Sequence, residues 1–368
     1  MITKKNIHII AEIGVNHNGD IKLAKRLMLT SKKLGADAVK FQTYDANEIV
    51  IKGAKKANYQ IINTKNSESQ YDMLKRYEFN HKDYLSLINY SNKINIPLLS
   101  TAADIKSLNY LTKKLKLKTI KIGSSDLTNI PLLLRAGASK KNIIISSGMA
   151  DLEEVDIALS ALSYGYDNKN KDKLSKFDIT KHNKLYKKYH SYLDNKITLL
   201  HCTTEYPAPL NELNINIIDM LKERYKISIG YSDHSNNPLT PIIAASKNIS
   251  VIEVHVTLDK SLPGPDHLCS LNPQEFHDYI RNIRNTELIL GSEIKKSTKS
   301  EIKNKKNVRK SLIAKKDIIK GEAISEDNMT VKRPGKGIPS LFYNTYIGKV
   351  VNKNIKANKF IRKNDIKS

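Results

Sequence analysis

The feature that most constrains the fold is a series of eight short segments rich in Ile and Val, with amphipathic segments between them. Alternation of strand-like and helix-like segments favours parallel strands joined by helices. Eight such units over about 290 residues predict an α/β fold, a parallel (β/α)₈ barrel. The eight strand-like runs cover residues 7–15, 37–43, 97–102, 119–124, 142–148, 196–203, 227–234 and 251–257.

The pattern of apolar and polar residues changes after the predicted barrel. Short β-rich runs and Gly-containing turn signals predict a small, separate β-rich domain over 308–368. We expect the barrel to occupy 1–292 and a lysine-rich, charged and extended linker to occupy 293–307.

Two inserts interrupt the alternation. Residues 44–80 follow the second strand, on the face where barrels of this kind carry their sites, and we predict that they cover a substrate. Residues 166–195 precede the sixth strand, and we expect them to be peripheral and on the opposite face.

Composition excludes several classes of protein. The chain has 62 Lys+Arg against 37 Asp+Glu, but the basic residues are scattered, which favours a solvated surface over a nucleic-acid partner. No apolar run reaches the roughly 18 residues of a membrane span, and the first residues lack the features of a secretory signal, so we expect a cytoplasmic protein without a membrane partner. Cys202 and Cys269 lack the spacing of a zinc ribbon or a disulfide scaffold.

Polar side chains follow the ends of all eight predicted strands, where barrels of this type hold their active sites. A single Ser at such an end is often a helix cap, and a single Lys often extends to solvent. Helix capping alone would not require polar side chains at the end of every strand, so their presence on all eight favours a common site. Apart from the lysines and histidines, the candidates are Glu12, Gln42, Thr101, Ser124, Asp126, Ser146, Thr204, Tyr206, Ser232 and Glu253.

Lys40 and Lys121 alternate with apolar neighbours and therefore point to the same side of the sheet as the strand-end hydroxyls. Two ammonium groups among Ser and Thr predict a site for an anion, either a phosphate or a phosphorylated carboxylate. The alternative is a Schiff-base lysine, as in class I aldolases.

His234 and His255 end adjacent predicted strands. Two imidazoles in that position can bind one cation and leave open positions for substrate and water. Glu12 and Glu253 could complete or flank such a metal site.

Eight motifs, in order from about residue 7 to 365, resemble those of the sialic acid synthase family, the phosphoenolpyruvate-condensing nonulosonate synthases. They are IIAEIGVNHNGD, AVKFQT, KIGSSDLTNIP, IISSGM, HCTTEYPAP, IGYSDHS, LDKSLPGPDH and VKRPGKG. The resemblance implies a TIM barrel followed by an antifreeze-like SAF domain of β-clip type. It also implies a domain-swapped homodimer in which each small domain covers the partner's barrel.

The resemblance also implies roles for individual residues. Glu12, Lys40, Lys121 and Asp126 would be catalytic, and Arg333 would reach the sugar from the other subunit. His234 and His255 would bind a divalent metal, Mn²⁺ first and Mg²⁺ or Co²⁺ as alternatives. Phosphoenolpyruvate would be held by Lys40, Thr101, Lys121, Ser124, Ser146 and Ser232, and the open-chain amino sugar by Glu12, Gln42, Tyr206 and Asp266, with Thr204 and Glu253 also in the binding site.

The implied reaction condenses phosphoenolpyruvate with an N-acetylmannosamine-type aldehyde to give N-acetylneuraminate and phosphate. An alternative acceptor is 2,4-diacetamido-2,4,6-trideoxymannose, giving legionaminate, because Thr204 and Glu205 resemble that subgroup at least as well. The sequence departs from the usual bacterial pattern at Ala102-Ala103, Asp126 and Val254. More remote alternatives are a Schiff-base lyase and a non-enzymatic polyanion-binding protein.

Overall fold

The computed structural model describes residues 7–65, 67–168, 170–193 and 195–367. The chain divides into two compact units, one ending at Gly291 and one beginning at Ser292. Residues 1–6 of the predicted barrel domain, and residues 66, 169 and 194 of the two inserts, lie outside the described residues.

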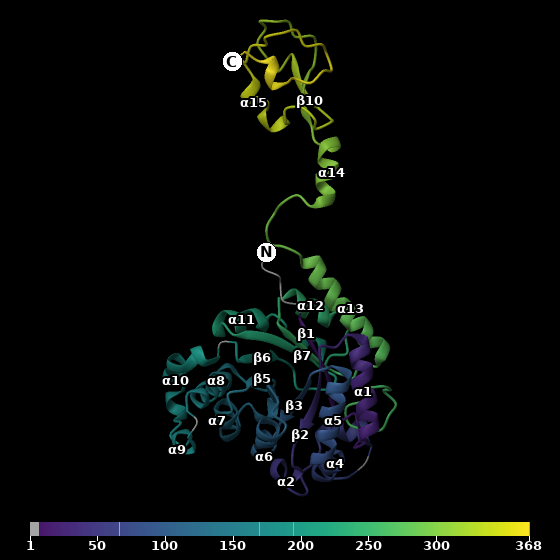
Figure 1. Cartoon of the computed structure of the whole chain (residues 1–368), viewed down its shortest axis with the longest axis vertical. Coiled ribbons are helices and arrows are strands. Elements are labelled where there is room, and N and C mark those ends of the chain that lie inside the picture. The colour runs from purple at the N-terminus through teal and green to yellow at the C-terminus, as the bar shows by residue number, and fades with distance from the viewer. Residues whose placement is uncertain (1–6, 66, 169, 194, 368) are drawn as a thin grey trace. The chain divides into compact units, whose positions relative to one another are not determined.

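The first unit is a closed barrel of eight parallel strands in sequential order, which confirms the predicted fold (Figure 1). Its neighbouring strands pair in order from β1 to β8, and β8 closes on β1. The strands are β1 (His8–Gly14), β2 (Ala38–Thr43), β3 (Leu98–Ala102), β4 (Thr119–Ile122), β5 (Asn142–Ser146), β6 (Ile197–His201), β7 (Ser228–Asp233) and β8 (Val251–His255).

Helices surround the barrel, as the alternating pattern predicts (Figure 1). Local capping explains several helix ends. The Asp20 side chain accepts a hydrogen bond from the Lys22 amide at the start of α1, and Gly35 ends that helix with a left-handed φ of 106°. The main helices are α1 (Ile21–Leu34), α5 (His81–Ile94), α6 (Ile105–Asn109), α7 (Ile130–Ala138), α8 (Leu152–Asp167), α11 (Ile217–Tyr225), α12 (Thr240–Ser246) and α13 (Pro273–Leu290).

Both inserts contain helices of their own. The insert after β2 forms α2 (Ala46–Ile49), α3 (Asn58–Thr64) and α4 (Gln70–Tyr77). The insert before β6 includes α9 (Lys171–Leu174) and α10 (His182–Tyr189), and α10 packs against α8.

The barrel interior changes from apolar to polar along the strands. Side chains two residues apart on a strand point to the same face of the sheet. Two residues after each inward-pointing apolar side chain, the strand therefore places a second inward-pointing side chain, nearer its carboxyl end. The buried apolar layer is Ile10, Ala38, Leu99, Ile144, Leu200 and Val251. Two residues farther along the chain lie Glu12, Lys40, Thr101, Ser146, Cys202 and Glu253, so the strands themselves position the polar cluster.

The second unit contains α14 (Lys299–Val308), the antiparallel pair β9 (Ser311–Ala314) and β10 (Met329–Lys332), and α15 (Tyr343–Tyr346). The prediction of an extended linker over 293–307 was wrong for its second half, which lies in α14. The helix begins there because Thr298 and Glu301 cap each other: the Thr298 Oγ1 accepts from the Glu301 amide at 3.3 Å, and a Glu301 carboxylate oxygen accepts from the Thr298 amide at 2.7 Å.

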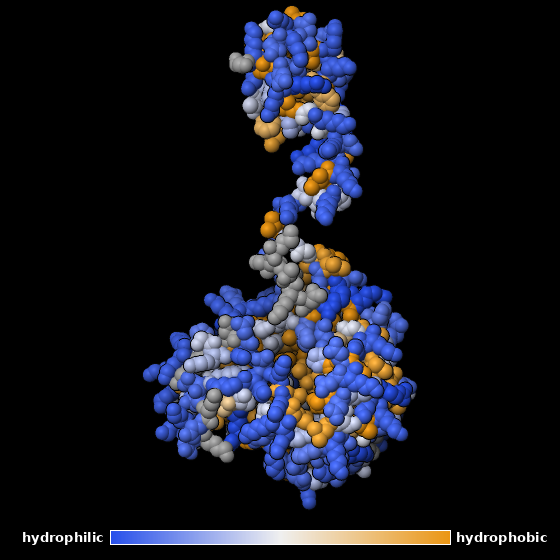
Figure 2. All heavy atoms as spheres, in the orientation of Figure 1, coloured by the Kyte–Doolittle hydropathy of each residue, from blue (hydrophilic) through white to orange (hydrophobic). Residues whose placement is uncertain are grey.

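Hydrophilic side chains dominate the visible face of each unit (Figure 2). Within the described part of the chain, we find no helix with both the length and the apolar character needed to span a membrane.

Candidate active site

Strand register brings the polar side chains to the same level of the barrel. Glu12 on β1 is paired with Lys40 on β2 and with His255 on β8. Thr101 on β3 is paired with Lys121 on β4. These residues belong to the carboxyl ends of their strands, the end at which barrel enzymes carry their chemistry.

A buried network of charges occupies this end. The Lys40 ammonium lies 2.8 Å from a Glu12 carboxylate oxygen, 3.4 Å from Glu253 and 3.1 Å from the Thr101 hydroxyl. The Lys121 ammonium lies 3.0 Å from the same Glu253 oxygen, so one carboxylate bridges both lysines. The two cations predicted from the sequence are therefore together, but each is already paired with a carboxylate.

Neutral side chains extend this network. Gln42 donates a hydrogen bond to Glu12 at 3.0 Å, and Ser232 donates to Glu253 at 3.4 Å. Both carboxylates are thereby fixed from two sides, one side by a lysine and the other by a polar neighbour.

Burial and charge act in opposite directions within the network. Burial raises the pKa of Glu12, although Lys40 favours its charged form. Burial disfavours the charged form of Glu253, but the attraction of Lys121 and Lys40 outweighs it and lowers the pKa to about 2. Burial lowers the pKa of Lys121 despite its contact with Glu253, whereas for Lys40 the nearby carboxylates of Glu12 and Glu253 outweigh burial and raise the pKa.

Two hydroxyls beside the charged network have no hydrogen-bond partner although they are buried. These are the Oγ of Ser146 and the Oγ1 of Thr204. Ser124 lies close by: its hydroxyl accepts from the Gly148 amide at 3.1 Å and lies 3.2 Å from the Cys202 sulfur. Thr204 also lines a cleft of about 590 Å³ at the ends of β5 and β6. Unsatisfied buried hydroxyls are costly, so both are candidates for hydrogen bonds to a polar ligand.

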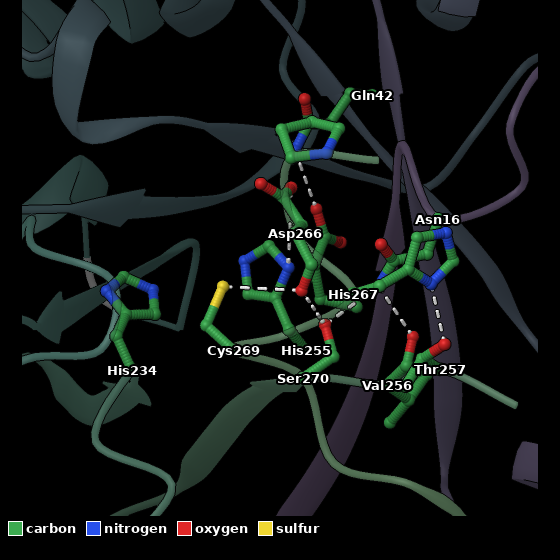
Figure 3. Close-up of polar contacts among 12 residues, drawn as sticks. Asn16, Gln42, His234, His255, Val256, Thr257, Asp266, His267, Cys269 and Ser270 are labelled. Carbon is green, nitrogen blue, oxygen red and sulfur yellow. Dashed lines mark hydrogen bonds and ion pairs between the residues drawn. The ribbon is translucent and has the colours of Figure 1, made fainter. Parts of the chain in front are cut away.

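The two predicted metal ligands lie near each other, with their ring centroids 5.7 Å apart (Figure 3). The Nδ1 of His234 is 2.7 Å from the Thr203 carbonyl, and its Nε2 is 3.3 Å from the Ser232 hydroxyl. The Nδ1 of His255 is buried without a hydrogen bond. The Tyr206 ring packs against His234 with centroids 4.2 Å apart.

The donor chemistry of this pair fits a divalent cation. Burial is the main cause that lowers the pKa of His234 to about 3 and that of His255 to about 4, so both imidazoles are neutral at pH 7, as metal ligands must be. Within the described ranges, no three or more His, Cys, Asp or Glu side chains form a group that could hold a metal. A cation here would therefore depend on substrate and water for its remaining ligands, as catalytic sites do.

Asp266 approaches the same pair from the loop after β8. Its carboxylate lies 3.8 Å from the Nδ1 of His255, and burial raises its pKa to about 7. The loop is fixed to the turn after β1 through Ser270, whose hydroxyl donates to the Asp266 carbonyl at 2.6 Å and accepts from the Asn16 amide group at 2.8 Å (Figure 3). The predicted sugar-binding carboxylate thus has a fixed position beside the histidines.

Asp126 makes its hydrogen bonds outside this network, and Arg333 belongs to the second unit. Asp126 lies in a short 3-10 turn, where its carboxylate accepts from Asn129 at 3.0 Å and from Ser125 at 3.4 Å. Arg333 is an exposed residue of the second unit.

Sequence reasoning missed two contacts of the site. The Thr203 carbonyl orients His234, but backbone groups carry no residue signature. Tyr59, on α3, lies with its ring centroid 4.9 Å from that of Tyr206. The only signal for Tyr59 was its place in an insert predicted to cover a substrate.

Comparison with known proteins adds an independent finding. The NeuB family model matches residues 27–295, and the SAF domain model matches residues 309–367. The chain belongs to the NeuB family. Within it, the chain is 44% identical to N,N'-diacetyllegionaminic acid synthase of Campylobacter jejuni over 97% of this chain and 99% of that protein.

Other relatives agree with this membership. The Legionella pneumophila protein named N,N'-diacetyllegionaminic acid synthase is 38% identical over 95% of this chain and 91% of its own length. The crystal structure of N-acetylneuraminic acid synthetase from Leptospira borgpetersenii, in complex with citrate, matches with a TM-score of 0.65 and 30% identity, covering 82% of this chain and 90% of that one.

Proposed function

We propose that this NeuB-family protein is a transferase that condenses phosphoenolpyruvate with an N-acylated mannosamine-type aldehyde. The products would be a nine-carbon 2-keto sugar acid and phosphate. The observation that carries the proposal is the meeting, at one end of the barrel, of two buried lysines, two unpartnered hydroxyls and a pair of neutral histidines.

The acceptor that we favour is 2,4-diacetamido-2,4,6-trideoxymannose. The relatives at 44% and 38% identity are both named N,N'-diacetyllegionaminic acid synthases. This supports the alternative acceptor of the sequence analysis over N-acetylmannosamine.

The lysines would stabilise the negative charge of phosphoenolpyruvate and of the departing phosphate. Lys40 and Lys121 lie 3.4 Å and 3.0 Å from one oxygen of Glu253, so a bound anion would take over part of the role of that carboxylate. Hydroxyl donors would come from Thr101 and Ser232, which contact the network, and from Ser124 and Ser146 beside it.

His234 and His255 would hold a divalent cation, Mn²⁺ first, which would supply Lewis-acid polarisation of the sugar aldehyde. Gln42, Tyr206 and Asp266 would orient the open-chain sugar. Glu12, fixed by Lys40 and Gln42, would orient the water that adds to C2 before phosphate leaves.

We also propose a cytoplasmic homodimer in which Arg333 reaches the sugar bound in the partner's barrel. The support is the resemblance of the VKRPGKG segment to the family motif and the exposure of Arg333 on its own unit.

The test is phosphate release from phosphoenolpyruvate with the diacetamido sugar or with N-acetylmannosamine. We expect release that stops with EDTA and returns with Mn²⁺, and a product whose mass equals that of sugar plus pyruvate. Variants His234→Gln and His255→Gln should lower kcat/KM by about 100-fold or more. Borohydride trapping of pyruvate on Lys121 without any metal requirement would instead favour the Schiff-base lyase and overturn the proposal.

A further inference from the structure

The insert after β2 contacts the loops that follow β6 and β8. Tyr59 and Asn63 lie four residues apart on α3 and therefore share one face of the helix. The Tyr59 ring packs against Tyr206, in the loop after β6, with centroids 4.9 Å apart and an angle of 37° between the rings. The Asn63 amide donates to the Pro265 carbonyl, in the loop after β8, at 2.6 Å. Helix α3 thus joins two loops at the end of the barrel that carries the site.

The contacts behind α3 hold it in place. The buried Lys56 ammonium donates to the Thr64 hydroxyl at 2.7 Å, at the last residue of α3, and lies 3.8 Å from Glu68. Ile61 and Ile62, on the remaining faces of the helix, are exposed. The hydrogen bonds of Asn63 and Thr64 therefore hold the last turn of α3, and with it the face that carries Tyr59.

The Tyr59 hydroxyl keeps an unused hydrogen-bond donor. It accepts a hydrogen bond from the Gln60 amide group at 3.2 Å, and the Gln60 carbonyl oxygen accepts from the Ala57 amide at 3.0 Å, which fixes the orientation of that amide. A phenol that accepts one hydrogen bond can still donate its own proton. Among the described residues, we find no acceptor for this proton.

The surroundings of Tyr59 belong to the acceptor side of the site. Its ring contacts Tyr206, and Tyr206 packs on His234 with ring centroids 4.2 Å apart. Burial is the main cause that raises the pKa of Tyr59, and the nearby Asp266 carboxyl contributes, so the phenol stays neutral and protonated. Aromatic rings beside one free donor match an acetamido group, because its methyl group is apolar and its carbonyl oxygen accepts a hydrogen bond.

We infer that Tyr59 is a specificity-determining residue that binds the second N-acyl group of the acceptor sugar. Its ring and that of Tyr206 would pack against the acetamido methyl group, and its hydroxyl would donate to the acetamido carbonyl. A sugar with a hydroxyl at that position has no methyl group to pack against the rings, and its oxygen lies closer to the sugar ring than an acetamido carbonyl oxygen does. This inference rests on the proposed function.

The test compares Tyr59→Phe with the wild type, using both sugars and measuring KM for sugar and for phosphoenolpyruvate separately. We expect a roughly 10-fold rise in KM for the diacetamido sugar, little change in KM for phosphoenolpyruvate, and a change of less than about 2-fold in kcat/KM for N-acetylmannosamine. The matched control is Tyr71→Phe: Tyr71 lies on α4 of the same insert, and its hydroxyl donates to Asn47 at 2.9 Å. It should behave as the wild type.

Two results would overturn the inference alone: equal losses with both sugars, or a Tyr59→Phe variant that matches Tyr71→Phe. Tyr59→Ala adds a second check, because loss of the ring should lower kcat/KM for the diacetamido sugar further than loss of the hydroxyl. A wild-type protein that releases no phosphate with either sugar would instead overturn the proposed function, and this inference with it.

Discussion

We expect a single carboxylate, that of Glu253, to link the stability of the barrel to its proposed affinity for anions. It bridges Lys121 and Lys40, and all three side chains are buried. The variant Glu253→Gln would leave two buried ammonium groups with Glu12 as their remaining anionic partner in the network, and we expect it to lower the free energy of unfolding by about 3 kcal/mol. Phosphoenolpyruvate should stabilise this variant more than it stabilises the wild type, because the added anion replaces the lost charge. Thermal unfolding with and without phosphoenolpyruvate measures both effects.

The matched control is Asp219→Asn, which removes the same charge from an exposed pair with Lys247. Exposed pairs contribute little, so this variant should lie within about 1 kcal/mol of the wild type. A smaller stabilisation of Glu253→Gln by phosphoenolpyruvate would contradict the argument and assign Glu253 to direct contact with the ligand.

The sequence predicts which side chains of the site point into the barrel, because side chains alternate between the two faces of a strand. Alternation placed Lys40 and Lys121 inside the barrel, and the structure has both there. The partner of Lys121 was not predictable, because Glu253 lies on β8, across the barrel from β4. Such a contact depends on barrel closure and on side-chain reach, neither of which leaves a local pattern in the sequence.

Among the elements, α7 and α8 cross at two glycines that allow close backbone contact. A Cβ added at Gly165 would lie 2.3 Å from the Leu134 carbonyl oxygen, and one at Gly137 would lie 2.2 Å from the Leu162 carbonyl oxygen. We expect Gly165→Ala to lower the free energy of unfolding by about 2 kcal/mol, because the helices must separate, and this outweighs the roughly 1 kcal/mol that Ala gains in helix propensity. Urea unfolding measures the change.

Gly123→Ala serves as the control for this crossing. A Cβ at Gly123 would lie no closer than 3.7 Å to any neighbouring atom. The free energy of unfolding of this variant should therefore stay within about 1 kcal/mol of that of the wild type. A Gly165→Ala variant as stable as the wild type would show that the crossing can relax without cost.

The eight strands were predictable as elements because each is a short Ile- and Val-rich run between amphipathic helices. Helix α3 was not, since its seven residues are too few for a stable isolated helix. It depends on contacts made elsewhere in the fold, such as Lys56 with Thr64 and Asn63 with Pro265. Local sequence patterns therefore could not predict the contact that the insert makes with the site through α3.

For the whole molecule, the change to short β-rich runs and Gly-containing turn signals was enough to predict a second, β-rich part. That part has its own apolar core, which includes Leu312, Ile318, Val351 and Ile361. The helix before it was missed because its lysine-rich sequence presents no apolar face, and its start depends on a reciprocal cap at Thr298.

The proposed dimer makes a prediction that depends on both units. Arg333→Ala and Lys121→Met should each lower activity strongly, since each removes one cation from the proposed site. Heterodimers isolated by two different tags should recover about half of wild-type activity if Arg333 serves the partner's barrel, because one site of the two then has both residues. If Arg333 served its own barrel, neither site would be intact and no activity would return. Heterodimers of Lys121→Met with Lys40→Met are the control and should stay inactive in either arrangement, since both changes lie in the barrel.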